Sequence, residues 1–522
     1  MPWLTIALFL PLAGAVVLLI IPRLADRLAR GVALLVSVAT FAVSLAVLAN
    51  FDRSADGYQL MDEAAWVKAL HLKYVVGVDG ISLFLVLITT FLFAIAVLAS
   101  FREVRSVRTL MASLLALETF VLGTFVSLDL LLFFLFFEAT LFPAYLLIAG
   151  WGGERRAGAA IKFFIYTMAG SAFLFLAVLF VFFKLGTFDI RVLQDSASSL
   201  SIDTGRWLFL GFLVAFAVKA PLVPFHAWQP DAYTESPTGA LLVIAGVMPK
   251  IATYGLLRFN LGLFPEAAHY FSDLVSILAL VGIVYGAVVA IVQTDLKRLV
   301  AYSSISHIGF IALGIFAFNQ QGLSGGVLYM VNHALSTGLL FVLVGMLYER
   351  TRTRDLARMG GIAQVTPKMA AAFLVVGLAS MGLPGLNNFV SEFLVILGAF
   401  GANKAFGAIA AAGILLSAIY LLWAYQRAMH GPLRQEHVAT RDLTRMEYAV
   451  IVPVFVAILF LGLYPKPVLD RVNPATCRSS VAAAAQGIGV SPDEVVRATG
   501  NCARSAGFTS YGPLDEVREG GG

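Results

Sequence analysis

The strongest constraint on the fold is a series of fourteen apolar runs, each about 20 residues long. They cover approximately residues 3–21, 31–50, 80–100, 109–127, 130–149, 161–183, 207–226, 238–260, 273–293, 299–318, 325–348, 370–400 (long and interrupted), 405–426 and 448–466. Runs of this length span the hydrocarbon core of a membrane as helices. Charged residues make up 13% of the chain, whereas a soluble domain carries about 25%. The sequence therefore predicts an all-α polytopic membrane protein with about 14 transmembrane helices.

Loop charges predict the orientation of these helices. Numbering each loop by the span that it follows, the odd-numbered loops hold 20 Lys and Arg residues and the even-numbered loops hold seven. The loop after span 11 alone contains Arg350, Arg352, Arg354, Arg358 and Lys368. Positive residues accumulate in cytoplasmic loops, so we expect the odd loops in the cytoplasm and both termini outside. The first run lacks a positive n-region, so we expect no cleavable signal.

A lysine inside span 7 is the clearest functional signal. Lys219 stands in FAVKAPLVPFHAW, just ahead of Pro221 and Pro224. A charge at bilayer depth costs roughly 2.5–3.5 kcal/mol on insertion scales. The prolines break the helix, which a membrane tolerates only where protein or water satisfies the freed backbone groups. A buried lysine beside a broken helix is typical of an ion-translocation site.

Glu138 lies deep in span 5, within LLLFFLFFEATLFPAYLL. It is either a neutral, hydrogen-bonded structural acid or a titrating carboxylate that acts as counter-ion to Lys219. Burial disfavours both charges and pairing restores them. Moving the two groups apart would therefore switch the lysine between holding and releasing a proton.

Three further titratable residues lie in spans 8, 10 and 11. Lys250 follows Pro249 and stands about twelve residues into span 8, so it is expected to be central rather than snorkelling to an interface. His307 in SSISHIGF and His333 in YMVNHALSTG are either packed, hydrogen-bonded residues or hydrated relay positions, because histidine titrates near neutral pH.

Glu392 follows a second interruption, in span 12. Gly382, Pro384 and Gly385 break the helix, and the asparagines at 387–388 offer polar groups to the gap. The glutamate is interpreted as functional, with a neutral structural acid as the alternative.

The two interrupted spans lie five spans apart, and an odd offset reverses the direction through the membrane. Interrupted helices at corresponding places in opposed halves indicate an inverted repeat. We therefore predict two inverted five-helix repeats with interrupted helices 7 and 12. The expected division is 1–107 (helices 1–3), 108–260 (helices 4–8), 261–427 (helices 9–13), 428–469 (last loop and helix 14) and 470–522 (extracytoplasmic tail).

The tail carries the only cysteines in the chain, Cys477 and Cys502. On the predicted topology they face the oxidising side, so they form a disulfide or remain two free thiols. The tail is expected to be peripheral, with a short helix from Pro492 to Thr499.

Five other charged residues carry weaker signals. Glu118 in span 4 suits a functional or a structural role equally, Asp129 is expected to cap span 5, and Arg258 is expected to snorkel. Asp231 and Glu235 would form a proton entry or an interfacial cap. The sequence has no Walker loop, dinucleotide fingerprint, CxxC cluster or haem-spaced histidine pair, so no redox cofactor and no metal are expected on this chain. Its positive charge lies in membrane loops, which gives no sign of nucleic-acid binding.

The segment VKAPLVPFHAWQPDAYTESPTGALLVIAGVMPK resembles the signature of the antiporter-like membrane subunits of respiratory complex I and of Mrp-type antiporters. The resemblance covers about residues 75–465. It implies that Glu138 pairs with Lys219, that Lys250 is the central relay, that His307 and His333 are relay histidines, and that Glu392 is the terminal charged residue. Two positions depart from the family pattern, because Gln229 and Tyr233 replace a usual leucine and histidine.

The resemblance also implies a function. It implies a proton-translocating subunit of a bacterial plasma-membrane NADH:quinone oxidoreductase, with sister antiporter-like chains as neighbours. NADH, FMN, iron–sulfur clusters and quinone would then lie in partner subunits. The alternatives are a subunit of an Mrp-type sodium/proton antiporter, a subunit of an energy-converting hydrogenase, and a structural spacer whose charges only hold helices together.

Overall fold

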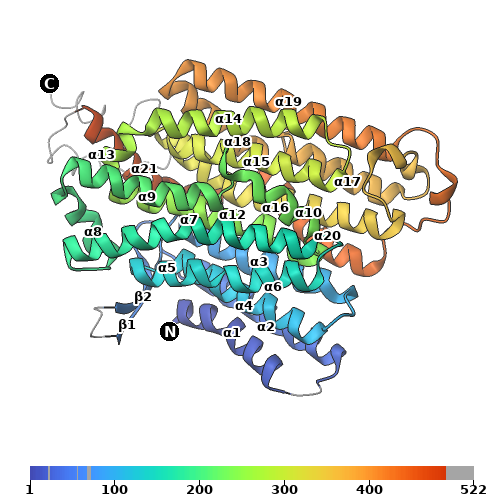
Figure 1. Cartoon of the computed structure of the whole chain (residues 1–522), viewed down its shortest axis with the longest axis horizontal. Helices are drawn as coiled ribbons and strands as arrows, with labels where there is room; N and C mark the ends of the chain where they lie inside the picture. Colours follow the sequence, from blue (N-terminus) through green and yellow to red (C-terminus); the bar gives the residue numbers. More distant parts are fainter. Residues whose placement is uncertain (22–23, 56, 68–71, 489–522) are drawn as a thin grey trace.

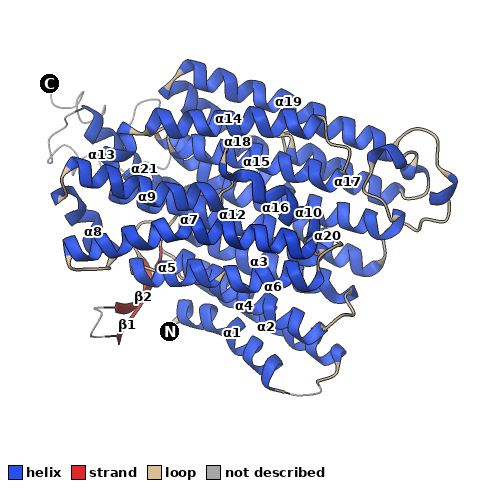
Figure 2. Cartoon of the chain, viewed as in Figure 1, coloured by secondary structure: helices blue, strands red, loops and turns tan. Residues whose placement is uncertain are grey.

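The computed structural model describes residues 1–21, 24–55, 57–67 and 72–488, and these are mostly helical (Figures 1 and 2). The helices lie side by side, and the connecting segments gather at the two ends of the bundle (Figure 1). The helices are α1 (Trp3–Ile20), α2 (Asp26–Ala49), α3 (Ser82–Ala99), α4 (Val107–Val126), α5 (Leu130–Ala139), α6 (Leu141–Trp151), α7 (Arg156–Leu185), α8 (Ile190–Ser196), α9 (Ile202–Lys219), α10 (Gln229–Glu235), α11 (Thr238–Gly246), α12 (Met248–Gly255), α13 (Pro265–Tyr270), α14 (Ser272–Ile291), α15 (Leu296–Ile315), α16 (Gln320–Thr351), α17 (Pro367–Ser380), α18 (Asn387–Ala402), α19 (Lys404–Met429), α20 (Arg445–Leu463) and α21 (Lys466–Ile488).

All fourteen predicted spans correspond to helices in the bundle. Within the described residues, twelve helical segments are long and apolar enough to cross a membrane by themselves. The other two spans are the ones predicted to be interrupted: span 7 is α9 followed by α10, and span 12 is the shorter pair α17 and α18. Span 12 falls outside the twelve because its break leaves helices of 14 and 16 residues, whereas α9 has 18 residues but carries three charged side chains, Asp203, Arg206 and Lys219.

The break in span 12 depends on two glycines. Gly382 and Gly385 have φ angles of +74° and +91°, a left-handed conformation that glycine adopts without the steric penalty of a side chain. Spans 5 and 8 are also irregular, which the sequence analysis did not predict. Span 5 is divided into α5 and α6 at Thr140, and α12 continues into a π-helical turn, Leu256–Leu261 (η5).

Two equivalent loop contacts support the inverted symmetry. Asp129 pairs with Asp189 across one isolated bridge, and Asp295 pairs with Asp355 across another. In each case the two segments exchange backbone hydrogen bonds of 2.8–2.9 Å, and each aspartate caps the helix that follows it. The first bridge joins loops 4 and 6 and the second joins loops 9 and 11. Because successive spans alternate in direction, the two bridges lie at opposite ends of the bundle. The predicted capping role of Asp129 is confirmed.

The structure adds a β-hairpin that the sequence analysis missed. Strands β1 (Gln59–Val67) and β2 (Leu72–Val78) pair antiparallel in loop 2. The segment LKYVVGV of β2 is rich in β-branched and aromatic residues, which favour strands.

The tail is only partly described, and its first part is not peripheral as predicted. Helix α21 packs against α16, where Thr476 and Ser324 share a buried 2.7 Å hydrogen bond, and Cys477 is fully buried. Val468, Leu469, Val472 and Ala475 are also buried, so this part of α21 covers the bundle. The predicted helix Pro492–Thr499 and Cys502 lie outside the described residues, so the disulfide stays a prediction.

Candidate functional site

Lys219 ends α9 beside the residues that flank Glu138. Its ammonium group donates to the Phe137 carbonyl (2.9 Å) and to the Thr140 hydroxyl (2.8 Å), and it lies 3.9 Å from the Phe137 ring centroid. The carbonyl is available because α5 ends at this turn. The half-buried Glu138 interacts electrostatically with Lys219, and its Oε1 atom is buried with no hydrogen-bond partner. The structure thus brings the two charges together without direct contact.

Lys250 begins a second group of polar side chains at the centre of the bundle. Its Nζ atom lies 2.5 Å from Nδ1 of His333 and 3.4 Å from the Ala245 carbonyl. On its other side, His333 Nε2 lies 3.3 Å from the Ser304 hydroxyl. The lysine and the histidine are 1% and 0% exposed, so the protein interior surrounds this pair.

The group continues from His333 to Glu392. The rings of His333 and His307 are 5.4 Å apart, and His307 Nε2 lies 3.2 Å from the Tyr420 hydroxyl. Tyr329 lies between this pair of histidines and Glu392, and its hydroxyl donates to Glu392 Oε1 at 2.5 Å. We call the set Lys250, His333, His307, Tyr420, Tyr329 and Glu392 the central line. It draws on α12, α15, α16, α18 and α19.

The sequence analysis missed both tyrosines of the central line. Tyr329 had a usable signal, because it stands four residues before His333 in YMVNH and residues at that spacing share one helix face. Tyr420 is surrounded by apolar residues on α19, and nothing in its neighbourhood distinguishes it from a packed aromatic residue.

Asparagines hold the broken helix beside Glu392, as predicted. Asn332 Nδ2 donates to the Asn387 carbonyl (2.6 Å), and Asn387 Nδ2 donates to the Asn332 carbonyl (2.9 Å). These reciprocal bonds connect α16 to the first turn of α18, where helical N–H groups lack partners within the helix. A Cβ atom added at Gly382 would collide with Glu392 Oε2. The glycine therefore provides both the turn and the space for the carboxylate.

The charges of this region have few counter-charges. In the part of the chain that the structure describes, Lys219, Lys250 and Glu392 have no ion-pair partner within 4.0 Å. Histidines, hydroxyls and carbonyls surround them instead. Such groups can hold or pass a proton without fixing its position, which suits transfer along the line.

The weaker candidates divide into several environments. Glu118 is buried and accepts from Ser37 at 3.1 Å, with its other oxygen unpartnered. Arg258 does not snorkel: it is buried and donates to Asp79 at 2.7 Å, because this acid at the start of α3 lies within reach. Burial and the nearby arginine act in opposite directions on Asp79, and the net effect lowers the pKa of this carboxyl.

Asp231 and Glu235 line a cavity of about 1390 Å³ at the end of the bundle where the odd-numbered loops meet. Asp231 accepts from Lys162 (2.7 Å) and Arg298 (2.9 Å). Glu235 accepts from the backbone N–H of Arg155 at 3.0 Å. Both acids thus take part in interfacial contacts while facing the cavity.

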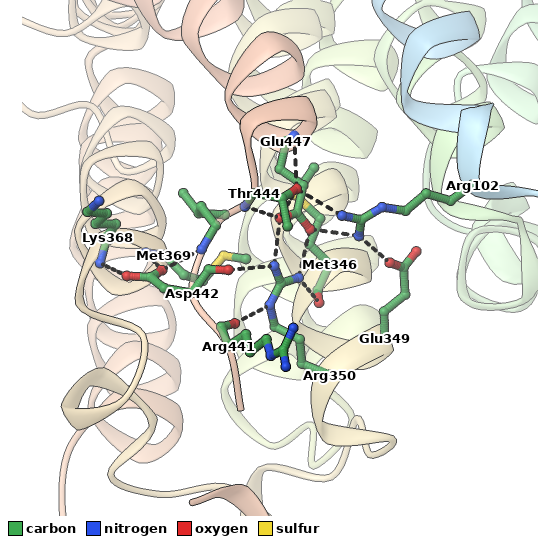
Figure 3. A network of polar contacts seen from close by, with 11 residues as sticks. Arg102, Met346, Glu349, Arg350, Lys368, Met369, Arg441, Asp442, Thr444 and Glu447 are labelled. Atoms are coloured by element: carbon green, nitrogen blue, oxygen red, sulfur yellow. Dashed lines mark hydrogen bonds and ion pairs between the residues drawn. The ribbon is translucent and has the colours of Figure 1, made fainter. Parts of the chain in front are cut away.

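Beside this cavity lies a compact ion cluster (Figure 3). Glu447 at the start of α20 accepts from Arg350 (2.6 and 2.8 Å) and from Arg102 (2.8 Å), and it forms a capping box with Thr444. Arg102 also reaches Glu349 at 3.0 Å. We call this set the arginine clamp, and it joins the ends of α3, α16 and α20. Across the described residues, no group of three or more His, Cys, Asp or Glu residues is arranged to hold a metal ion.

Comparisons with known proteins agree with this geometry. The family model described as NADH:quinone oxidoreductase/Mrp antiporter, TM matches residues 127–419. NADH-quinone oxidoreductase subunit M of Mycobacterium tuberculosis is 42% identical over 514 residues, covering 91% of this chain and 93% of the relative. A chain of respiratory complex I from Thermus thermophilus with bound NADH superposes with a TM-score of 0.84 at 32% identity, covering 92% and 99% of the two chains.

A chain of the Mrp complex from Dietzia sp. has a TM-score of 0.81 at 22% identity, covering 94% of this chain and 98% of that one. This similarity shows the shared fold alone. The family match covers both broken helices and every residue of the central line except Tyr420. The chain therefore belongs to the family of antiporter-like membrane subunits that NADH:quinone oxidoreductase and Mrp antiporters share.

Proposed function

We propose that this chain is the M-type proton-translocating subunit of a bacterial plasma-membrane NADH:quinone oxidoreductase. Electron transfer from NADH to quinone, through FMN and iron–sulfur clusters in partner subunits, would supply the energy. The sister antiporter-like chains L and N would be its membrane neighbours, and both termini would face outside. The glutamate at position 392 supports the M type, because the family resemblance implies lysine at this place in chains L and N. The similarity to subunit M relatives favours this assignment over an Mrp-type antiporter.

The central line is the observation that carries the proposal. It places six titratable or hydroxyl side chains in sequence through the middle of an apolar bundle, beginning with Lys250 and ending with Glu392. A charge that only held helices together would need a counter-charge. Lys250 and Glu392 have none within the described residues, so proton transfer explains the arrangement better than helix packing does.

Glu138 and Lys219 would control the protonation of this line. The attraction between two opposite charges about 4 Å apart is worth about 4 kcal/mol at an effective dielectric constant near 20. Lys219 bonds to Phe137 and Thr140, the neighbours of Glu138, so a small movement of α5 would form or break the ion pair. Lys219 would then exchange a proton with Lys250, and the proton would move through the histidines toward Glu392 and the outside.

The first test is isolation of the tagged chain from native membranes in mild detergent, with mass spectrometry and an NADH:quinone assay. Recovery with NADH-oxidising and iron–sulfur subunits in one active complex is expected. Recovery with only small antiporter-like partners and no NADH activity would support the Mrp-type alternative instead.

The second test is Glu138→Gln, which removes the charge and keeps the size of the side chain. It should abolish NADH-driven proton pumping in membrane vesicles while the complex assembles normally. Glu266→Gln, at an exposed position on α13, is the matched control and should pump normally. Normal pumping in Glu138→Gln would contradict the mechanism.

A further inference from the structure

We propose that Thr140 is a positioning residue for Lys219: its hydroxyl holds the lysine ammonium group away from Glu138 and so keeps the ion pair open between steps of proton transfer. This inference rests on the proposed function and adds a residue to its switch. The ammonium group contacts the Phe137 carbonyl, the Phe137 ring and the Thr140 hydroxyl, and we call these three groups the lysine cradle.

The cradle consists of groups that attract a positive charge. The ammonium group donates to the carbonyl at 2.9 Å and to the hydroxyl at 2.8 Å, and the ring centroid lies 3.9 Å away. The face of an aromatic ring carries partial negative charge and attracts cations. Phe137, Thr140 and Lys219 are 1%, 0% and 3% exposed. A buried ammonium group is costly unless it is hydrogen-bonded, and the cradle supplies these bonds without using Glu138.

The Thr140 hydroxyl is oriented to accept a hydrogen bond from Lys219. Its own proton is donated to the Phe137 carbonyl at 2.7 Å. A hydroxyl has one donor and two acceptor positions, and a carbonyl oxygen can accept two hydrogen bonds. The bond to Phe137 therefore turns a lone pair of the hydroxyl toward the lysine. The hydroxyl is thus an acceptor whose direction is set before the ammonium group arrives.

The break between α5 and α6 creates the cradle. Pro143 has no backbone N–H, so the Ala139 carbonyl lacks its usual donor and the helix is weakened in the turn that contains Thr140. Phe137 and Thr140 are three residues apart and share a side of this turn. Glu138 lies about 100° from Phe137 around the helix axis. The lysine side chain therefore has to turn from the cradle to reach the carboxylate.

The cradle and Glu138 compete for one ammonium group. A hydrogen bond from a charged donor is stronger than one between neutral groups. Its loss should shift the balance between the open and the closed pair by about tenfold or more toward Glu138. A pair that opens less often passes fewer protons from Lys219 to Lys250 for each NADH oxidised. Thr140 would thus set how readily the switch opens without taking up the proton itself.

The test measures protons pumped per NADH oxidised in vesicles that contain the assembled complex. Thr140→Val keeps the shape of the side chain and removes the hydroxyl, and the ratio should fall at least about threefold. Thr140→Ser keeps the acceptor and should pump normally. Thr124→Val is the matched control and should also pump normally. The Thr124 hydroxyl is equally buried and donates to the carbonyl three residues earlier at the same distance of 2.7 Å, but in the described structure it receives no hydrogen bond from a lysine.

Three outcomes would overturn the role of Thr140. They are a normal ratio in Thr140→Val, an equal fall in Thr124→Val, and a lower yield of complex with an unchanged ratio, which would indicate a purely structural role. Glu138→Gln separates these outcomes from failure of the proposed function. If it abolishes pumping while Thr140→Val pumps normally, only the cradle is wrong. If both variants pump normally, the proposed function is wrong as well.

A second measurement does not depend on pumping or on assembly of the complex. The tagged chain in its native membrane is treated with dicyclohexylcarbodiimide, which activates a carboxyl group so that a neighbouring amine can form an amide with it. Mass spectrometry then quantifies the peptide in which Glu138 is joined to Lys219, with Lys219→Arg as the background. The yield in Thr140→Val should be at least about threefold higher than in the wild type and in Thr140→Ser, because the pair is closed more often. Equal yields would overturn the proposal.

Discussion

The arginine clamp and the central line both bury charge, but they treat it in opposite ways. In the clamp, Glu447 is 2% exposed and receives hydrogen bonds from two arginines and from the Thr444 backbone. In the central line, Lys250 is 1% exposed and contacts a histidine and a carbonyl oxygen. One site neutralises its charge completely, whereas the other leaves it without an opposite charge.

The difference indicates what each site is for. Paired charges hold their positions because either partner alone would be an uncompensated buried ion. A lone buried lysine has no opposite charge to hold it in place. Its protonation state therefore changes with any nearby change of charge or hydration. The clamp is therefore suited to holding helix ends together, and the central line to changing its protonation state. Substitutions at the two sites should separate stability from pumping.

The largest effect is expected from Lys250→Met, which removes the first group of the central line. Proton pumping should fall by about tenfold or more, because intramembrane charges usually mark the transport path. Unfolding of the assembled complex should not occur at a lower temperature, because the substitution removes a lone buried charge. Vesicle pumping and thermal unfolding measure the two outcomes. Lys404→Met, at an exposed position on α19, is the control for loss of a positive charge.

Glu447→Gln should produce the converse result. It leaves Arg350 without its carboxylate, whereas Arg102 keeps its contact with Glu349, and breaking a buried ion pair in this way costs about 3–5 kcal/mol. The complex should unfold at a lower temperature and assemble in lower yield. The complexes that remain should pump the same number of protons per NADH as the wild type. A lower ratio in intact complexes would show that the clamp also takes part in transport.

Gly382→Ala should affect stability and pumping together, but less strongly. An alanine in the left-handed conformation costs roughly 1–2 kcal/mol, and its Cβ atom would displace the Glu392 carboxylate. Gly385→Ala is the matched control, since its φ is also positive but no atom lies within 4 Å of the added carbon. Reduced pumping in the first variant alone would link the position of Glu392 to transport. Equal pumping in both variants would mean that the added Cβ atom at position 382 does not affect transport through the central line.

The smallest effect is expected from Asp129→Ala, which removes the cap of α5. Loss of an N-cap costs about 1 kcal/mol, and pumping should be unchanged because the residue lies outside both sites. Thermal unfolding of the assembled complex measures the change. Asp129→Asn keeps a capping oxygen and should retain most of the stability. A large loss of pumping in Asp129→Ala would mean that the end of α5 transmits movement to Glu138.

The site was predicted from sequence where a polar residue contrasts with an apolar helix. Lys219, Lys250, Glu138 and Glu392 stand out for this reason, since charge at membrane depth is rare and costly. Tyr329 and Tyr420 do not stand out, because a tyrosine in a span is equally at home as a packed aromatic residue. Arg258 was misjudged because its partner, Asp79, is distant in sequence and meets it only in the folded bundle.

The sequence by itself determined the membrane-spanning helices, the two breaks and the identity of the buried charges. These follow from properties of short segments: apolar length, proline and glycine positions, and the cost of a charge in hydrocarbon. Only the tertiary structure decided which of these charges have partners, where α21 packs, and that tyrosines continue the line from the histidines to Glu392. The physical reason is that pairing depends on distances of a few ångströms between helices far apart in the chain, and local patterns carry no information about those distances.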